Sequence, residues 1–410
     1  MNFLAVFKAL AAAFSADQSE PNMPEIVHYL TFFVLTILVI NTIIHVLLFP
    51  SQEVAVPSDV GVRVSVMVPA RNEAMNIEAC VRSLLAQDWP NLELLVLNDC
   101  SEDETGRILE TFRDSRLQLL QGTELPAGWS GKNWACHQLA AKASGEWLIF
   151  LDADTVLESR AVTSLVDMAT RRRVDLLCAW TNQVFGTVIE RATIPILTFM
   201  AASVSNAALV NWIQDRPSWL MDRFKGFAVR GGVANGQCMV FSRTCYEELG
   251  GHEGVKAEIV EDLAFAVKVA QGIPNGRRLI NCDAKRFIRC RMYRSACELW
   301  TGFTRSAWAN TFKQPFQSLV LVAFGTLILV MPYVSLLTSW GNQSLVRMEV
   351  GALILIPTLL CIRFRRNPLE ILLFPLGVVV SIAISLNAIF LYRKKGVDWK
   401  GRIYGPKEGA

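Results

Sequence analysis

The sequence predicts an α/β domain with a mostly parallel sheet and flanking helices, placed between apolar segments that cross a membrane. Residues 63–180 alternate short runs rich in Val, Leu and Ile with amphipathic stretches of helical period. Unbroken apolar strands that alternate with helices are typical of a parallel sheet covered on both faces. Only 19% of the 410 residues are charged, against roughly 25% in soluble domains. The net charge of +3 is too small to indicate a nucleic-acid partner.

The strands and helices expected in this domain follow one another along the chain. The strands are expected at residues 64–68, 92–97, 117–120 and 147–151, with helices at 77–87, 104–112 and 133–143. Ligands of such sheets bind at the carboxyl ends of the strands. The residues that directly follow each strand are therefore the first place to look for a functional site.

Apolar segments lie on both sides of the domain. Residues 26–49 contain no Asp, Glu, Lys or Arg, and about 20 such residues cross a bilayer core, so we expect a transmembrane anchor there. A second apolar region covers residues 318–392, with spans expected at 318–340 and 371–392. Residues 350–362 are short and include Pro357. Both a short span and a re-entrant segment therefore stay open for them, which leaves two or three segments in this region.

Other segments are expected at the membrane surface. Residues 294–313 place aromatic side chains on one helical face and mostly basic and polar ones on the other, which predicts an interfacial helix, with a core-facing helix as the alternative. Residues 1–25 are predicted as an interfacial N-terminal segment, and residues 393–410 as a basic tail. Residues 192–214 are uncharged, but a span there would separate the acidic motifs before and after it, so we expect no crossing.

The ten cysteines indicate the compartment of the domain. None forms a CxxC pair, and most lie in apolar runs. Buried, reduced thiols fit a domain that faces the cytosol better than disulfides or a zinc site do. We therefore expect an integral membrane protein whose catalytic domain, residues 60–293, faces the cytoplasm.

Polar loops follow three of the predicted strands. They contain Pro69, Arg71 and Glu73 after the first strand, Asp99 after the second, and Asp152 and Asp154 after the fourth. Carboxylates packed together repel one another and take up protons unless a cation lies among them. Carboxylate and water ligands suit Mg²⁺ or Mn²⁺, whose coordination is usually completed by substrate phosphates. The sequence therefore predicts a divalent metal at this edge of the sheet.

Two further charged motifs are candidates for the same site. The sequence contains no GxGxxG and no P-loop motif, so a diphosphate would be held by the metal and by basic side chains. Lys132 is a candidate for this contact, because Gly128 and Gly131 beside it allow close approach to a ligand. Asp262, after Glu261, is either a general base that accepts a hydroxyl proton or a simple helix cap.

The ordered set of these motifs resembles the family 2 inverting glycosyltransferases, which have the GT-A fold. The set consists of VPARNE at residues 68–73, the Asp99 loop, Asp152-Ala153-Asp154 and Glu261-Asp262. The resemblance covers about residues 63–308. Residues 126–132, Gly236-Gln237 and residues 250–253 are similar to the branch that contains ceramide glucosyltransferases and bacterial hopanoid or carotenoid glycosyltransferases.

The resemblance implies roles for individual residues. Asp99 would contact the base or ribose of the donor, and Asp154 with Asp152 would hold the metal and the sugar-diphosphate. Pro69, Arg71, Glu73 and Lys132 would belong to the same donor site. Asp262 would be the base of an in-line displacement with inversion at the anomeric carbon, while the metal neutralises charge on the departing diphosphate.

One departure from the family pattern concerns the Q/RxxRW motif. The nearest residues are 286–293, where Cys290 stands in place of the Trp. Arg289 or Arg291 would then supply the phosphate or acceptor contact. Glu261 is a further candidate for such a contact. The missing Trp counts against a processive polysaccharide synthase. The tail at residues 399–404 resembles the end of the same branch, which makes Trp399 and Arg402 further candidates for such a contact.

The function implied is transfer of a sugar from a nucleotide-diphosphate sugar, with a UDP-sugar favoured, to a hydroxyl of a lipid or other hydrophobic acceptor at the membrane surface. One alternative is a polyprenyl-phosphate monosaccharide synthase, whose anionic acceptor needs little help from a base. An alternative of another class is a catalytically silent membrane scaffold or transporter. The intact set of four aspartates and the absence of charge within the clear spans count against that alternative.

Overall fold

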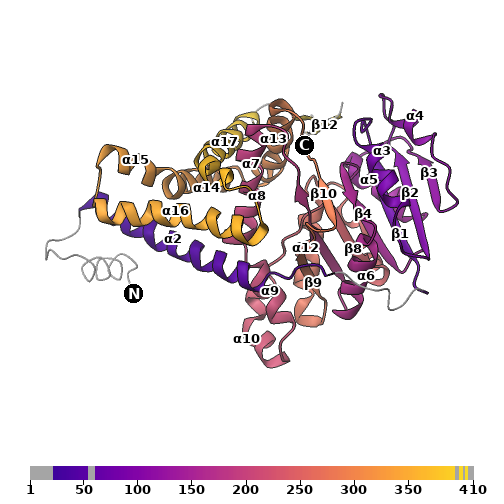
Figure 1. Cartoon of the computed structure of the whole chain (residues 1–410), viewed down its shortest axis with the longest axis horizontal. Helices are drawn as coiled ribbons and strands as arrows, with labels where there is room; N and C mark the ends of the chain where they lie inside the picture. Colours follow the sequence, from indigo (N-terminus) through magenta and orange to yellow (C-terminus); the bar gives the residue numbers. More distant parts are fainter. Residues whose placement is uncertain (1–21, 54–60, 393–396, 400–401, 405–410) are drawn as a thin grey trace. The chain divides into compact units, whose positions relative to one another are not determined.

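The computed structural model of the chain describes residues 22–53, 61–392, 397–399 and 402–404, without the side chains of residues 308–313 and of those beyond 391. The chain divides into two compact units (Figure 1). Of the described residues, the helical unit contains 22–47, 188–205 and 303–392, and the sheet unit contains 48–53, 61–187, 206–302, 397–399 and 402–404.

A seven-stranded sheet forms the centre of the sheet unit, in the order β3-β2-β1-β4-β8-β6-β9 (Figure 1). Its strands are β1 (Val64–Ala70), β2 (Leu92–Asn98), β3 (Leu117–Gln121), β4 (Trp147–Leu151), β6 (Leu176–Trp180), β8 (Cys238–Ser242) and β9 (Leu279–Asp283). All neighbouring pairs are parallel except those of β8, which runs antiparallel to β4 and β6. The prediction of a mostly parallel sheet is confirmed.

Helices cover both faces of this sheet because successive side chains of a strand point to opposite faces. Val66 and Val68 of β1 pack in one apolar core with α3 (Ile77–Leu85) and α6 (Ala161–Arg171). Met67 lies in a second core, with α5 (Gly131–Ala140) and α12 (Glu261–Gln271). The other helical elements of the sheet unit are α4 (Thr105–Leu109), α9 (Ala207–Gln214), α10 (Ser218–Ala228), α11 (Arg243–Glu248), η2 (Gly251–Val255) and η3 (Ile273–Asn275).

Two smaller sheets complete the unit. The first joins β5 (Thr155–Leu157), β10 (Ile288–Cys290) and β7 (Asn182–Gln183), with β10 in the middle. It places residues 288–290 beside the chain that leaves β4. The second is a hairpin of β11 (Val397–Trp399) and β12 (Arg402–Tyr404).

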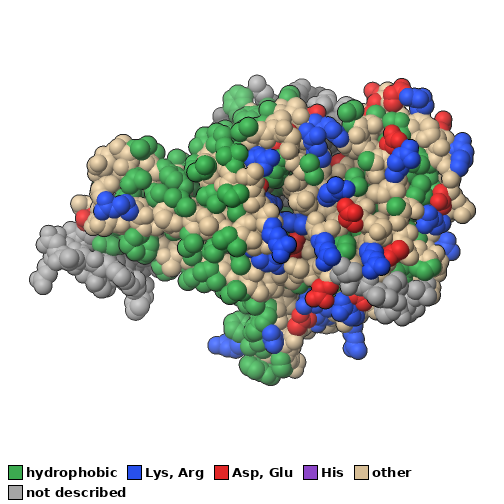
Figure 2. Space-filling model, viewed as in Figure 1, with side chains coloured by type: hydrophobic (Ala, Val, Ile, Leu, Met, Phe, Trp, Pro, Cys, Tyr) green, Lys and Arg blue, Asp and Glu red, His purple; other side chains and the backbone are tan. Residues whose placement is uncertain are grey.

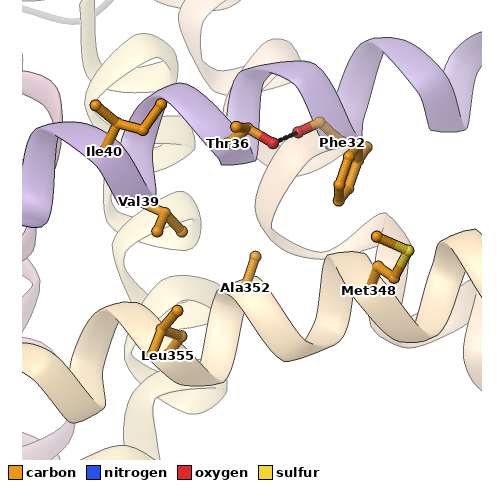
Figure 3. Close-up of a pocket in the computed structure, with 7 residues that line it drawn as sticks. All are labelled: Phe32, Thr36, Val39, Ile40, Met348, Ala352 and Leu355. Atoms are coloured by element: carbon orange, nitrogen blue, oxygen red, sulfur yellow. Dashed lines mark hydrogen bonds between the residues drawn. The ribbon is translucent and has the colours of Figure 1, made fainter.

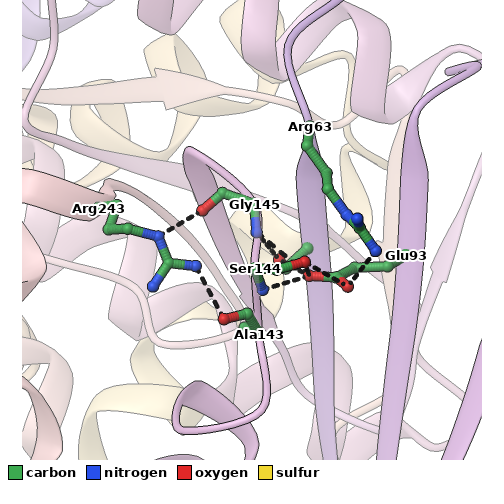
Figure 4. A network of polar contacts seen from close by, with 7 residues as sticks. Arg63, Glu93, Ala143, Ser144, Gly145 and Arg243 are labelled. Carbon is green, nitrogen blue, oxygen red and sulfur yellow. Dashed lines mark hydrogen bonds and ion pairs between the residues drawn. The ribbon is translucent and has the colours of Figure 1, made fainter.

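A buried carboxylate ties the amino ends of three strands together at the edge opposite the carboxyl ends (Figure 4). Glu93, the second residue of β2, accepts hydrogen bonds from the Ser144 hydroxyl, the Gly145 N–H at 3.2 Å and Arg63 at 2.9 Å. Arg243 holds the same turn by donating to the carbonyl of Gly145 at 2.7 Å. Burial raises the pKa of Glu93, but the hydrogen bonds and Arg63 outweigh that effect and lower it.

The helical unit contains long apolar helices. Its elements are α2 (Met23–Leu48), α7 (Val188–Thr193), α8 (Pro195–Phe199), η1 (Met200–Val204), α14 (Pro315–Leu329), α15 (Met331–Thr338), α16 (Gln343–Phe364) and α17 (Leu369–Tyr392), with α13 (Ala296–Lys313) leading into it. Among the described residues, three helices are long and apolar enough to span a membrane: 23–48, 343–364 and 369–391. The anchor predicted at 26–49 and the span at 371–392 thus correspond to α2 and α17.

Two segments predicted in the C-terminal region have other helix bounds in the structure. The span expected at 318–340 is broken into α14 and α15, which meet at a bend of 41°. The short segment at 350–362 is the inner part of α16, a helix of 22 residues that passes through Pro357. Residues 192–214 do not form one helix: they divide among α7, α8, η1 and α9, and α9 belongs to the sheet unit while the others belong to the helical unit. The segment 1–25 and the tail 393–410 lie almost wholly outside the described residues, and the interfacial position of 294–313 stays a prediction.

Buried polar contacts join the helices of this unit. Nδ1 of His28 on α2 lies 2.9 Å from Oε2 of Glu349 on α16, and both side chains are fully buried. Asn41 donates to the carbonyls of Ser203 and Ser205 at 2.9 Å. Such contacts fix the partners of α2 more specifically than apolar packing alone does.

An apolar groove of about 330 Å³ lies between α2 and α16 (Figure 3). It is lined by Phe32, Thr36, Val39, Ile40, Met348, Ala352 and Leu355. The Thr36 hydroxyl donates to the carbonyl of Phe32 at 2.8 Å, so the one polar side chain of the lining is satisfied by its own helix. The groove contains none of the predicted site residues, which all belong to the sheet unit.

Candidate active site

The predicted polar loops leave the central sheet side by side. Ala70 at the end of β1 pairs with Asn98 at the end of β2, and the N–H of Asp99 donates to the carbonyl of Ala70 at 2.7 Å. Asp152 follows β4, and its N–H donates to the carbonyl of Gln237 at 3.1 Å. The three loops therefore begin at one edge of the sheet, as their places after parallel strands predicted.

Arg71 and Glu73 hold the first two loops in place. Arg71 Nη1 donates to the carbonyls of Asp99 and Cys100 at 2.8 and 2.9 Å, and the N–H of Glu73 donates to the Thr105 hydroxyl at 2.8 Å. Pro69 lies in β1 itself, beside Leu97. In this structure Arg71 positions the Asp99 loop, and a direct contact of these residues with a donor stays a prediction.

Lys132 links two of the acidic motifs. It lies in the first turn of α5, where the Ser130 hydroxyl accepts from the N–H of Asn133 at 3.3 Å and caps the helix. Its ammonium lies 2.7 Å from Asp152 Oδ1 and 2.8 Å from Glu261 Oε1. Burial lowers the pKa of Lys132, but the two carboxylates outweigh that effect and raise it. The side chain therefore stays cationic at the centre of the site.

Asp262 differs from its neighbour Glu261 in its electrostatic surroundings. Burial and the nearby charge of Glu261 raise the pKa of Asp262 to about 6, although Lys132 acts in the opposite direction. The pKa of Glu261 is lowered instead, because the attraction of Lys132 outweighs burial. Two adjacent carboxylates thus have separate roles: Glu261 pairs with the lysine, and Asp262 can take up a proton near neutral pH.

The alternative reading of Asp262 as a helix cap does not fit the geometry of α12. The cap position is occupied by Val260, and no side chain caps this end of the helix. The Asp262 carboxylate accepts from the N–H of Leu263 at 2.8 Å, and the N–H of Gly236, from a different segment, also donates to it. Gly236 lies directly against it, since a Cβ at this position would be 2.9 Å from Asp262 Oδ2. Glycine at 236 therefore leaves room for the carboxylate.

The residues expected to hold a metal lie around one buried thiol. Burial raises the pKa of Cys80, and the charges of Asp154, Glu73 and Asp152 raise it further, so the three carboxylates face the same region. Among the described residues, no group of three or more His, Cys, Asp or Glu side chains has the arrangement of a metal-binding cluster.

The described residues thus do not form a protein cage for a metal, and the chemistry of the loop fits a partial site. Mg²⁺ and Mn²⁺ commonly use one or two carboxylates and complete their coordination with water and phosphate oxygens. Asp154, which is partly exposed at the mouth of the loop, fits this chemistry. Asp152 is instead paired with Lys132, at 2.7 Å.

Residues 289–291, in and just after β10, have different surroundings, and this separates the two candidate arginines. Cys290, in place of the family's Trp, is buried and its thiol donates to Asp154 Oδ1 at 3.4 Å. Arg289 points to the other side and lies 3.2 Å from Glu158, with both side chains about half exposed. The N–H of Arg291 donates to the carbonyl of Asp154 at 3.2 Å. Arg291, rather than Arg289, is therefore the cation beside the Asp154 loop.

Arg291 also has unused hydrogen-bonding capacity. Its Nε is buried without a partner among the described residues, and its guanidinium lies so close to Gly186 that a Cβ there would be 2.0 Å from Nη2. The other two candidates for this contact, Trp399 and Arg402, are paired in register across the β11–β12 hairpin, and their side chains lie outside the described part of the chain.

Sequence analysis missed an amide cluster beside Asp152. The side-chain oxygen of Gln237 accepts from the Thr181 hydroxyl, from Gln183 at 2.7 Å and from Asn235 at 3.2 Å. Thr181 follows β6, which ends at the same edge of the sheet as β4. Neutral polar residues are common in loops, so only the strand order, which the sequence pattern did not predict, would have indicated them.

A buried histidine, His252, lies close enough to Glu261 to interact with its charge. His252 Nδ1 lies 2.7 Å from the Tyr246 hydroxyl, and burial lowers the pKa of His252 to about 3. Gly251 has a φ of +51°, and a Cβ there would lie 2.8 Å from the Tyr246 ring. The glycines of the 250–253 motif therefore form a tight turn that packs a neutral histidine behind Glu261.

The ten cysteines of the chain are all free, and eight of them are buried. The prediction that most of them are reduced buried thiols is thus in agreement with the structure. Cys100 and Cys297 are the exposed ones.

Comparison with known proteins identifies the domain that carries this site. Residues 65–213 match the family described as Glycosyl transferase family 2. A 4,4'-diaponeurosporenoate glycosyltransferase of Staphylococcus aureus is 24% identical over 354 residues, which cover 83% of this chain and 88% of that protein. The solved mannosyltransferase PcManGT of Pyrobaculum calidifontis, in complex with GDP-Man and Mn²⁺, has 18% identity and a TM-score of 0.50, with 93% of this chain and 99% of that chain covered.

The similarity to the solved structure concerns the fold, and the predicted GT-A type of fold is confirmed. The resemblance inferred from the ordered acidic motifs is confirmed by the family match. Residues 65–213, which include Asp99, Lys132, Asp152 and Asp154, therefore match a glycosyl transferase family 2 domain.

Proposed function

We propose that the chain is an inverting glycosyltransferase that moves a sugar from a nucleotide-diphosphate sugar to a hydroxyl of a lipid-like acceptor at the cytoplasmic face of a membrane. Three observations support this proposal. The domain belongs to a glycosyltransferase family, three helices are long and apolar enough to span a bilayer, and one similar protein is named for a carotenoid-type acceptor.

The observation that carries the mechanism is the pKa of Asp262. A carboxylate with a pKa of about 6 is largely ionised at neutral pH and is a stronger proton acceptor than an ordinary Asp. In the proposed reaction, Asp262 takes the proton of the acceptor hydroxyl as that oxygen forms a bond to the anomeric carbon. The bond from the anomeric carbon to the donor phosphate breaks, and its electron pair stays on the departing diphosphate.

Cations of the chain would stabilise this leaving group. Lys132 is fixed between Asp152 and Glu261, and Arg291 lies beside the Asp154 loop with a free Nε. We infer that both contact phosphate oxygens of the donor. A divalent ion, Mg²⁺ or Mn²⁺, would be held by Asp154 with the phosphates and would neutralise further charge.

The proposal is tested by an Asp262→Asn variant in the purified full-length chain, with transfer measured from a nucleotide sugar to extracted membrane lipids. We expect a loss of transfer of about 10² to 10⁴-fold, with donor binding retained. Glu110→Gln is the matched control, because it neutralises an exposed carboxylate at the end of α4 and should leave activity unchanged.

Retention of nearly full activity in Asp262→Asn would overturn the assignment of the base. That result would favour the polyprenyl-phosphate alternative, whose acceptor is already an anion. Donor binding without any turnover in the unmodified chain, under all donors and lipids, would favour the silent scaffold.

A further inference from the structure

The helix α10 carries an exposed aromatic surface that the active site does not use. The exposed fractions of Trp219, Phe224 and Phe227 are 68%, 45% and 38%. Single exposed apolar residues are normal on a soluble surface, but three large aromatic side chains on one short helix are a cluster of the kind that marks an interaction site. Figure 2 shows this cluster of hydrophobic side chains over α10, at the bottom of the view, with basic side chains beside it.

The same helix is anchored to its own unit by a different set of residues. Ala228 is fully buried, and Leu220 and Met221 are partly buried. Met221 and Ala228 pack with the apolar core that lies under α5 and α12. The fold of the unit therefore does not need the aromatic side chains as a core, and their exposure is a property of the outer surface.

Basic residues surround this surface. Arg223 and Lys225 lie on α10 and are exposed, and so is Arg230 just after it. Arg216, just before the helix, stacks over the ring of Trp212 at 4.3 Å. Asp222 is the one acidic side chain of the helix, so cations outnumber carboxylates. A helix with aromatic side chains that is rich in Lys and Arg is typical of segments that lie in the interface of an anionic bilayer.

We propose that α10 is a membrane-contact helix: Trp219, Phe224 and Phe227 enter the interface of the bilayer, and Arg223 and Lys225 bind anionic lipid head groups. The occupant is a lipid surface rather than a protein partner, because the charge of the helix complements anionic lipid. The same chain also carries helices that can span the bilayer. This inference depends on membrane anchoring and does not depend on sugar transfer.

A short segment joins the membrane-contact helix to the proposed base. The chain that leaves α10 runs through Gly231 and Gly232 to Gly236, which touches Asp262. Gly232 packs so closely on α12 that a Cβ would lie 2.7 Å from the Cα of Val267. The segment between the membrane-contact helix and the proposed base is therefore tightly packed on α12, the helix that carries Asp262 in its first turn.

The test uses the full-length chain in nanodiscs with the photo-crosslinker p-benzoylphenylalanine at position 227. Leu119 is the matched control position, because it is an apolar residue of the same unit with nearly the same exposed fraction, 37% against 38%. Phe316 on α14, which is 76% exposed, is the positive control for contact with lipid. Adducts are identified by mass spectrometry after illumination.

We expect lipid adducts at positions 227 and 316 and none above background at 119. We also expect the yield at 227 to rise about fivefold or more when phosphatidylglycerol is added to phosphatidylcholine, and a double variant Arg223→Gln/Lys225→Gln to remove that rise. Equal labelling at 227 and 119 would overturn the proposal, as would adducts to protein in place of lipid at 227. Both results can be obtained with a chain that transfers no sugar, so failure here is distinct from failure of the proposed function.

Discussion

The ammonium of Lys132 lies 2.8 Å from Oε1 of Glu261, and this contact joins the first turn of α5 to the first turn of α12. Glu261 is almost fully buried, whereas its neighbour Asp262 is partly exposed. The lysine neutralises the buried carboxylate of Glu261. The pKa of Asp262 is nevertheless raised, by burial and by the charge of Glu261. The pair therefore links the proposed phosphate contact to the proposed base.

Replacement of Lys132 by Met should weaken both the fold and donor binding. Glu261 would be left as a buried charge without its cation, and breaking one side of a buried pair is strongly destabilising. We expect a lower melting temperature and at least a tenfold loss of donor affinity by calorimetry. The double variant Lys132→Met/Glu261→Gln should recover much of the melting temperature and none of the donor affinity. Unchanged donor binding in the single variant would remove Lys132 from the phosphate site.

The rate of transfer should depend on the ionisation of Asp262. The base works only when it is deprotonated, so kcat/KM should fall about tenfold per pH unit below pH 6 and level off above it. The test is a pH profile of kcat/KM for the acceptor, measured at a saturating concentration of the donor. A profile that is flat from pH 5 to 8 would contradict the role of Asp262.

Asp262 should also make the fold less stable at neutral pH. Its pKa is raised above the value of about 3.9 in the unfolded chain, so its favourable contribution is fully present below pH 4 and is lost as the pH rises through about 6. We therefore expect Asp262→Asn to melt at a higher temperature than the parent at pH 7.5 and at a similar temperature at pH 4. A lower melting temperature for the variant at pH 7.5 would show that the carboxylate stabilises the fold.

Glu93 should have the opposite pH dependence. Its pKa is lowered, mainly by hydrogen bonds from Ser65 and Ser144 that outweigh burial, so its stabilisation is present above pH 4.5 and is lost as the pH falls below that value. Glu93→Gln should lower the free energy of unfolding of the sheet unit by about 1.5–3 kcal/mol, measured by thermal or denaturant melts at pH 7. The network lies at the other edge of the sheet, so kcat at low temperature should stay near the parent value. A loss of kcat without loss of stability would contradict this account.

A methyl group at position 236 should displace the base. A Cβ there would lie 2.9 Å from Asp262 Oδ2, so Gly236→Ala should lower kcat at least about tenfold by moving the carboxylate, with a small change in melting temperature. Gly325→Ala is the control, since nothing lies within 4 Å of the added atom. Equal activity of the two variants would show that the position of Asp262 tolerates the shift.

The sequence predicted the parts of the fold and site that depend on local pattern. The apolar runs at 64–68 and 92–97 became β1 and β2, and the residues after them met at one edge because parallel strands end together. β8 was not predicted, although it lies inside the sheet, between β4 and β6. Its antiparallel pairing with β4 and β6 depends on contacts between distant segments, which no local pattern reports.

The extent of α16 illustrates the same limit. Because Glu349 is charged, the apolar segment was predicted to begin at residue 350, yet the helix begins at Gln343. The carboxylate is accepted inside the helical unit because His28, more than 300 positions earlier, lies 2.9 Å from it. Likewise, the contacts of Lys132 with Glu261 and of Cys290 with Asp154 join residues that are far apart in the chain, so their roles could not be read from spacing.

The most direct test of the central claim is to follow one labelled sugar from donor to lipid. The purified chain would be given a panel of nucleotide sugars, Mg²⁺ or Mn²⁺ and extracted membrane lipids, beside an Asp154→Ala variant. We predict metal-dependent release of nucleoside diphosphate, matched by an equal amount of a new glycolipid and absent in the variant. Tight binding of a nucleotide sugar with no release of nucleoside diphosphate and no glycolipid, under every donor and lipid supplied, would contradict the account.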